Sequence, residues 1–103
     1  MPVVKRIVID GVEISFCSRE VYCCNQAVVL TGLEFNLLWL LMNAFPKIVS
    51  RESIAKHIFN RSLEASNRSI SMHISTIRKK LLINTKHSRI KSFRGEGYVF
   101  LTR

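Results

Sequence analysis

The chain has 103 residues, of which 48% are apolar, and a formal net charge of +9. This length suits one domain, residues 1–103, with a core that needs no disulfide or metal, and the apolar content is too high for a disordered basic tail. The longest apolar run, Leu37–Met42, is much shorter than the roughly 20 residues of a membrane span, and the N-terminus has no signal-peptide core. We therefore expect a soluble, cytoplasmic domain that attracts polyanions and does not bind membranes.

Neither catalysis nor cofactor or metal binding is expected. Cys17, Cys23 and Cys24 show neither CxxC spacing nor a nearby histidine pair, so we interpret them as reduced packing residues. No Ser-His-Asp or Cys-His arrangement is legible among the few acidic residues and three histidines. Gly95 and Gly97 stand between two strand-like runs, which is typical of a hairpin and not of a phosphate-binding loop.

Residues 1–31 predict an antiparallel β-sheet. Between Arg6 and Leu30, short β-branched or aromatic runs alternate with turn-forming pairs such as Asp10-Gly11, a strong hairpin signal. Three or four strands are expected. Such a sheet has one face to bury, so the following segment should cover that face.

A three-helix core is predicted over residues 32–83. Thr31 and Glu34 have the spacing of a capping box at the start of the first helix, and Pro46 ends this helix. Its apolar residues lie on opposite faces, so we expect a helix packed on both sides, with Trp39 as a packing residue.

The second helix is expected to begin after Ser50, a suitable N-cap, and to run to about Phe59. The polar stretch Asn60–Ser66 shows no periodicity and is expected to be a loop that leads to the third helix.

The third helix is predicted from the stretch RSISMHISTIRKKL at Arg68–Leu81. At 100° per residue, one face gathers the apolar residues Ile70, Ile74, Ile77 and Leu81. The opposite face carries Arg68, Met72, Ser75 and Lys79, with Ser71 and Arg78 on one shoulder and His73, Thr76 and Lys80 on the other. No acidic residue occurs between Ala65 and Ser92, which indicates an anionic partner. Membrane binding would need a wide exposed apolar face, so nucleic acid is favoured.

Residues 88–103 predict a hairpin that carries Arg89, Lys91 and Arg94 around a Gly-Glu-Gly turn. The fold class is therefore α+β: a winged helix-turn-helix with an N-terminal antiparallel sheet, three helices and a C-terminal β-hairpin wing. Two other functions stay open. One is a small basic RNA-binding protein, although the third helix has no aromatic residue for base stacking, and the other is a protein-interaction winged helix.

Four segments, LTGLEFNLLWLL, IVSRESIAKHIF, RSISMHISTIRKKL and RIKSFRGEGYVF, resemble in order and spacing the DNA-binding domain of OmpR/PhoB-type response regulators. The third is similar to Cpx-type members, and the resemblance extends from Arg6 onward. It implies sequence-specific binding to double-stranded DNA in bacterial transcription regulation, with the third helix in the major groove, the wing in the adjacent minor groove, and a homodimer arranged head to tail on direct repeats.

The resemblance also implies roles for individual residues. Phosphate contacts are implied for Arg51, Arg68, His73 and Arg78, with neighbouring lysines such as Lys79, and Phe59 would pack against the DNA backbone. Base contacts are implied for Ser71, Met72, Ser75 and Thr76, and minor-groove contacts for Ser92 and Arg94. Family members often carry acidic residues at positions 67 and 71, where this chain has Asn67 and Ser71, so the family's base preferences do not transfer.

Two further expectations follow from the same resemblance. The loop before the third helix matches a position that touches RNA polymerase in the family, with Arg61, Leu63 and Glu64 as candidates, although a simple connector is an equal alternative. Family members usually carry a receiver domain ahead of this one. We therefore expect the effector domain of a two-component response regulator, with a stand-alone regulator as the alternative.

Overall fold

The computed structural model describes residues 6–82 and 89–101. The predicted end of the helical core at residue 83 and the predicted outer bounds of the hairpin at residues 88 and 103 lie outside this part of the chain.

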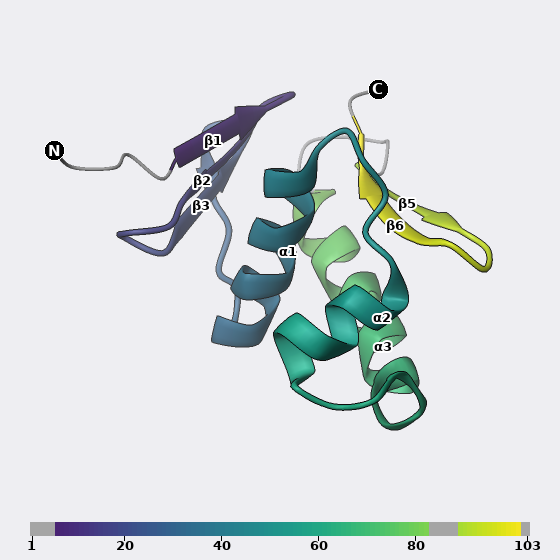
Figure 1. Cartoon of the computed structure of the whole chain (residues 1–103). Coiled ribbons are helices and arrows are strands. Elements are labelled where there is room, and N and C mark those ends of the chain that lie inside the picture. Colours follow the sequence, from purple (N-terminus) through teal and green to yellow (C-terminus); the bar gives the residue numbers. More distant parts are fainter. Residues whose placement is uncertain (1–5, 83–88, 102–103) are drawn as a thin grey trace, which may run out of the picture.

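The N-terminal segment forms the antiparallel sheet that the sequence predicts (Figure 1). Its strands are β1 (Arg6–Ile9), β2 (Val12–Ser15), β3 (Glu20–Cys23) and β4 (Gln26–Ala27), in that spatial order. Asp10 and Gly11 both have positive φ, as the tight turn between β1 and β2 requires. Alternate residues of β2 and β3, such as Val12 and Val21, face the core.

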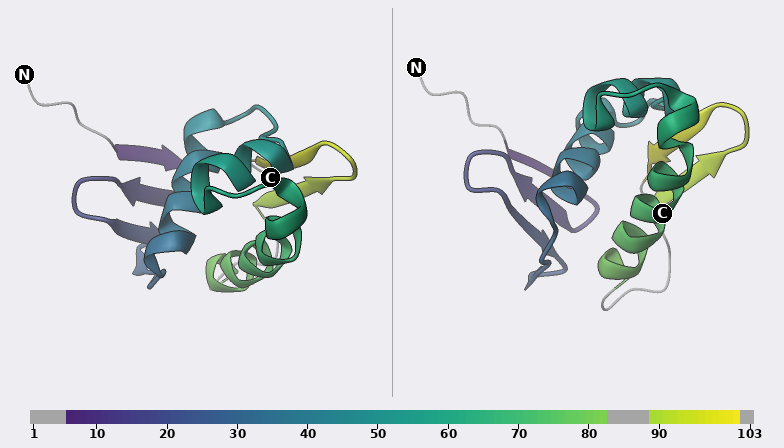
Figure 2. Two further views of the ribbon diagram at one scale, coloured as in Figure 1. Left: turned by 60° about the horizontal axis from the view of Figure 1, so that its bottom comes forward. Right: turned by 90° about the horizontal axis from the view of Figure 1, so that it is seen from below.

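Helix α1 (Gly32–Ala44) lies between this sheet and the other helices (Figures 1 and 2). The predicted capping box is present: the Glu34 backbone N–H donates to Thr31 Oγ1 at 3.2 Å, and the Thr31 N–H donates to Glu34 Oε1 at 3.0 Å. Both sides of α1 are buried, and Trp39 packs its ring 5.1 Å from that of Phe16. The prediction of a central packed helix is confirmed.

The second predicted helix consists of α2 (Arg51–Ile54) and a π-helical turn, η1 (Ala55–Phe59). Ser50 caps it by accepting a hydrogen bond from the Ser53 N–H at 3.0 Å. Asn60 ends it in the left-handed conformation, with φ of 54°.

The predicted loop Asn60–Ser66 is too long, because helix α3 already begins at Leu63 and runs to Leu81. Ser62 Oγ accepts a hydrogen bond from the Ala65 N–H at 3.3 Å, and Glu64 in the first turn is favourable for the helix dipole. The buried face contains the four residues that the 3.6-residue period predicts, Ile70, Ile74, Ile77 and Leu81.

Strands β5 (Ile90–Phe93) and β6 (Gly97–Phe100) form the predicted wing hairpin, whose turn projects from the body (Figure 1). Strand β6 is anchored in the core, because Val49 N–H donates to Tyr98 O at 2.8 Å and Tyr98 N–H donates to Val49 O at 3.0 Å. The interpretation of Arg89 as a basic group displayed by the hairpin is wrong. Arg89 is 5% exposed, and its Nε donates to Asp10 O at 3.0 Å.

The three cysteines are free, as expected, but only Cys23 packs in the core. Burial raises the pKa of the Cys23 thiol, which lies 3.4 Å from Leu81 O. Cys17 and Cys24 are exposed, so the prediction of a packing role is wrong for both. Within residues 6–82 and 89–101, no helix is long and apolar enough to cross a membrane.

Candidate nucleic-acid interface

Helix α3 presents an outward face of four exposed side chains, which we call the outer stripe: Arg68, Met72, Ser75 and Lys79. The sequence predicts this face, and the structure exposes all four. The side chains of Arg68 and Lys79 make no hydrogen bond or ion pair with another described residue, so both charges are available to a ligand. Since a helix rises 1.5 Å per residue, the Cα atoms of Arg68 and Lys79 lie about 16.5 Å apart along its axis.

His73 and Phe59 meet on one shoulder of α3. Their ring centroids are 5.6 Å apart in an edge-on arrangement, and His73 Nδ1 lies 2.7 Å from Ser69 O. A carbonyl oxygen only accepts, so Nδ1 carries a proton and Nε2 is left for an external partner. The structure therefore brings together two residues that the family resemblance assigns separately to the DNA backbone.

Thr76 lies on the same shoulder, half-buried, and donates its hydroxyl proton to Met72 O at 3.1 Å. Its side chain can therefore offer an acceptor lone pair and a methyl group to a ligand, but not a hydroxyl donor. On the other shoulder Ser71 is exposed, with its Oγ 3.5 Å from Arg51 Nη1.

Arg51 joins three elements of the interface. Its Nη1 donates to Asn67 Oδ1 of α3, and its Nη2 donates to the Tyr98 hydroxyl of β6 at 2.8 Å. The guanidinium carbon also lies 5.0 Å from the centre of the Tyr98 ring. Asn67 thus supplies an acceptor to Arg51 where family members often have an acid. Sequence reasoning missed Tyr98, although the segment RIKSFRGEGYVF contains it.

Arg78 ties the other end of α3 to the wing. Its Nε donates to Ile90 O at 3.0 Å, and its Nη2 donates to Ser92 Oγ at 2.6 Å. These contacts, together with those of Arg51, hold the wing beside α3 (Figure 2, right). Because both elements are fixed before a ligand arrives, binding would order few additional groups.

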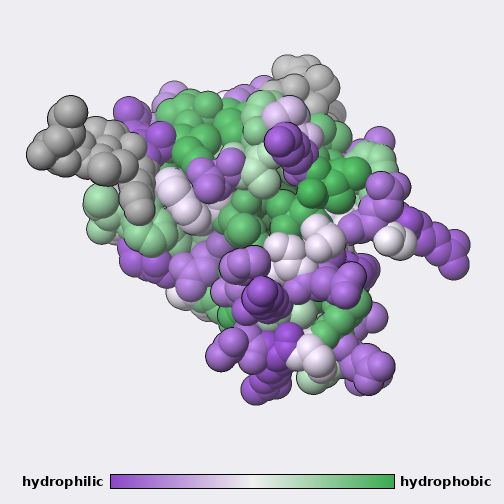
Figure 3. All heavy atoms as spheres, in the orientation of Figure 1, coloured by the Kyte–Doolittle hydropathy of each residue, from purple (hydrophilic) through white to green (hydrophobic). Residues whose placement is uncertain are grey.

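The wing hairpin displays charged side chains on β5 and at its turn. Lys91, Arg94 and Glu96 are exposed, and among the described residues Arg94 forms no ion pair with Glu96. Hydrophilic side chains gather over this turn and over the lower end of the molecule, where α2 and the first turns of α3 lie (Figure 3). The surface formed by the outer stripe and the wing is therefore polar and mainly basic.

Lys80, predicted on the shoulder with His73 and Thr76, is engaged away from the outer stripe. Its Nζ donates to Glu34 Oε1 at 2.7 Å, and this joins α3 to the start of α1. Burial alone would raise the pKa of Glu34, but the hydrogen bonds from Lys80 and the Thr31 N–H outweigh burial and lower it.

The three candidates for a polymerase contact do not share one loop. Arg61 lies in the short connection between η1 and α3, whereas Leu63 and Glu64 form the first turn of α3. Arg61 and Glu64 are exposed, and Leu63 packs partly against the core.

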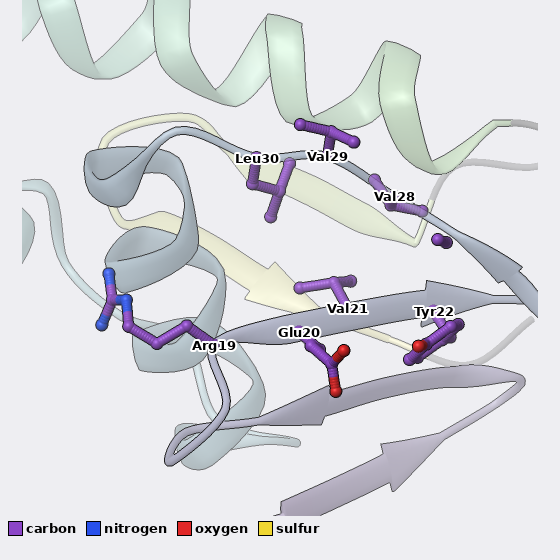
Figure 4. Close-up of a pocket in the computed structure, with 8 residues that line it drawn as sticks. Arg19, Glu20, Val21, Tyr22, Val28, Val29 and Leu30 are labelled. Atoms are coloured by element: carbon purple, nitrogen blue, oxygen red, sulfur yellow. The ribbon is translucent and has the colours of Figure 1, made fainter.

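A separate hollow lies along β3 and the segment between β4 and α1, lined by Arg19, Glu20, Val21, Tyr22, Ala27, Val28, Val29 and Leu30 (Figure 4). None of the predicted site residues lines it, so it is no part of the interface around α3.

Comparisons with known proteins agree with this geometry. Residues 25–100 match the family model described as "Transcriptional regulatory protein, C terminal". The transcriptional regulatory protein CpxR of Escherichia coli (strain K12) is 34% identical over 95 residues, which are 91% of this chain and 41% of CpxR. The chain thus spans less than half the length of this relative.

Two solved structures share the fold. The crystal structure of the DNA-binding domain of CpxR from E. coli has a TM-score of 0.84 and 32% identity, and the match covers 94% of this chain and 96% of that domain. The Klebsiella pneumoniae RstA DNA-binding domain, crystallised in complex with the RstA box, has a TM-score of 0.83 and 30% identity, with 94% and 97% covered. The chain therefore belongs to the family of C-terminal domains of transcriptional regulatory proteins, the winged-helix effector domains of OmpR/PhoB-type response regulators.

Proposed function

We propose that the chain binds double-stranded DNA, with α3 in the major groove and the wing in the adjacent minor groove, and so regulates transcription. The observation that carries this proposal is the outer stripe, an exposed helical face with a cation at each end and uncharged residues between them, held beside a basic wing. The RstA domain in complex with the RstA box supports it, because that domain shares the fold of this chain.

The phosphate contacts are assigned to the cationic and ring side chains around α3: Arg51, Phe59, Arg68, His73, Arg78 and Lys79. Because phosphates carry no sequence information, these residues set orientation and affinity. Base edges are assigned to the uncharged side chains of α3, Ser71, Met72, Ser75 and Thr76, and the minor groove to Ser92 and Arg94. Hydrogen bonds to α3, β5 and β6 hold the guanidinium groups of Arg51 and Arg78 beside the outer stripe, which supports this assignment.

The wider setting follows from the longer relatives. We propose that the chain acts in the cytoplasm as the effector domain of a two-component response regulator, as two copies arranged head to tail on a direct repeat. Arg61, Leu63 and Glu64 are proposed to contact RNA polymerase. Arg61 and Glu64 are exposed near the start of α3, which leaves both side chains accessible to a second protein.

A competition gel with duplex DNA and structured RNA tests the central proposal. At low salt, unlabelled duplex of random sequence should displace a labelled duplex at lower concentration than a hairpin RNA of equal charge does. Preferential displacement by the RNA would favour the RNA-binding alternative. Failure to bind either nucleic acid at low salt would favour a protein-interaction winged helix.

A further inference from the structure

Met72 is an exposed apolar side chain in the middle of the outer stripe. It is 60% exposed, and among the described residues it is the one large hydrophobic side chain of α3 that solvent reaches to this extent. Met72 does not pack in the core, because the buried face of α3 is formed by Ile70, Ile74, Ile77 and Leu81. Covering a thioether that is exposed to water with an apolar partner is favourable, because it removes apolar surface from water.

The charges of the outer stripe stand at its two ends. Arg68 lies about 6 Å before Met72 along the helix axis and Lys79 about 10 Å after it, at 1.5 Å per residue. The major groove, roughly 12 Å wide, admits an α-helix, and cations at the two ends of the inserted face can reach the phosphates that border the groove. Met72 and Ser75, between them, then face the base edges.

The base edge that fits a thioether is thymine. In the major groove the bases present hydrogen-bond donors and acceptors and a single apolar group, the C5-methyl of thymine. The middle of α3 has no carboxylate to accept from cytosine, because no acidic residue occurs between Ala65 and Ser92. The one amide of α3, Asn67, accepts from Arg51 through its Oδ1, and the hydroxyl proton of Thr76 is donated to Met72 O.

We propose that Met72 determines sequence specificity by packing its thioether against the C5-methyl of thymine, so that preferred sites carry thymine beneath the middle of α3. This inference rests on the proposed binding of α3 in the major groove. It adds to that proposal the base, thymine, and the group of that base, the C5-methyl, that Met72 contacts.

Replacing thymine by deoxyuridine removes only the methyl group and keeps the base pair, so it isolates this contact. The probes are duplexes that the chain itself selects from a random pool, with each thymine replaced in turn. At one or two positions the affinity of the unaltered chain should fall about three- to fivefold, the value of one buried methyl group. Met72→Ala should bind the thymine duplex more weakly than the unaltered chain does, by a similar factor. Replacing thymine by deoxyuridine should not weaken the binding of this variant further.

Two further variants sharpen the test. Val29→Ala removes an 83% exposed apolar side chain from the segment before α1 and should keep full sensitivity to deoxyuridine. Met72→Gln keeps the length of the side chain and adds an amide that pairs with adenine, so the preferred base should change from thymine to adenine.

The outcomes separate this inference from the proposed function. Tight binding to selected duplexes with no position sensitive to deoxyuridine overturns the role of Met72 and leaves DNA binding intact. Equal sensitivity in Met72→Ala and the unaltered chain also overturns it. No duplex binding at low salt overturns the proposed function, and this inference with it.

Discussion

Among the four glycines of the chain, Gly97 has the least room for a side chain, because β6 starts there against the segment before α2. A Cβ on Gly97 would lie 2.0 Å from Val49 O and 2.8 Å from Ser50 Cα. Both are backbone atoms, so no rotamer change relieves the clash. In Gly97→Ala the pair of hydrogen bonds between Val49 and Tyr98 must therefore open or shift.

The expected cost has three parts. Gly97 has φ of +143°, where a residue with a side chain is strained by about 1–3 kcal/mol. Overpacking contributes about 1–3 kcal/mol, and each lost backbone hydrogen bond about 1 kcal/mol. We expect Gly97→Ala to lower the free energy of unfolding by about 3–8 kcal/mol, a large share of the 5–15 kcal/mol typical of a domain.

Gly95→Ala is the matched control, because Gly95 lies two residues earlier, in the turn before β6, and also has positive φ, +79°, but has no atom within 4 Å of its Cβ position. It should cost about 1–2 kcal/mol, the strain of the left-handed conformation alone. Urea unfolding followed by fluorescence of Trp39, the one tryptophan of the chain, measures both variants. Losses that agree within about 0.5 kcal/mol would refute the close contact between the wing and Val49.

Three further predictions concern single side chains. Thr76→Ala should reduce the discrimination between bases at one or two positions by about 1–3 kcal/mol and leave the affinity for random DNA unchanged. An equal loss of affinity for specific sites and for random DNA would make Thr76 a positioning residue. Arg94→Ala should weaken binding more on A·T-rich than on G·C-rich flanks, because a narrow minor groove attracts a guanidinium; equal small losses on both flanks would argue against a groove contact. Glu34→Gln should destabilise the chain most above pH 4.5, the pKa of Glu in the unfolded chain. The fold lowers the pKa of Glu34, so this side chain stabilises the fold only while its carboxylate is charged. In urea unfolding the difference from the unaltered chain should shrink as the pH falls through the folded pKa, and a constant difference would contradict the ion pair with Lys80.

Local patterns explain what the sequence alone predicts well. The period of α3 separates Ile70 and Ile74 from Met72 whatever surrounds the helix, so both its buried face and its outer stripe could be predicted. The capping box at Thr31 and the Asp10-Gly11 turn are likewise short-range features.

Predictions from the sequence fail where contacts between distant parts of the chain determine the position of a side chain. Arg89 looks like a displayed cation in the sequence, but folding brings it against Asp10, 79 residues earlier, and buries it. Lys80 is drawn to Glu34 of α1 in the same way. The early start of α3 was missed because Leu63 is the one large apolar residue in its first two turns, too few to show a period.

The link between Arg51, Asn67 and Tyr98 also escapes sequence patterns, because it joins α2, α3 and β6 through side chains far apart in the chain. Arg51 could be matched to the family as a phosphate contact. Its part in holding α3 to the wing is visible only in the structure.

The salt dependence of binding to duplex DNA, measured by fluorescence anisotropy, tests the central claim most directly. Each phosphate contact contributes a slope of about −0.9 to a plot of log affinity against log salt, and the slope expected here is roughly −3 to −6 per monomer. Arg68→Ala should make the slope about 0.9 less steep. Arg6→Ala removes the same charge from β1, where Arg6 pairs with Glu13, and should leave the slope unchanged. A nearly flat plot, or equal changes in the two variants, would contradict binding of DNA by the outer stripe of α3.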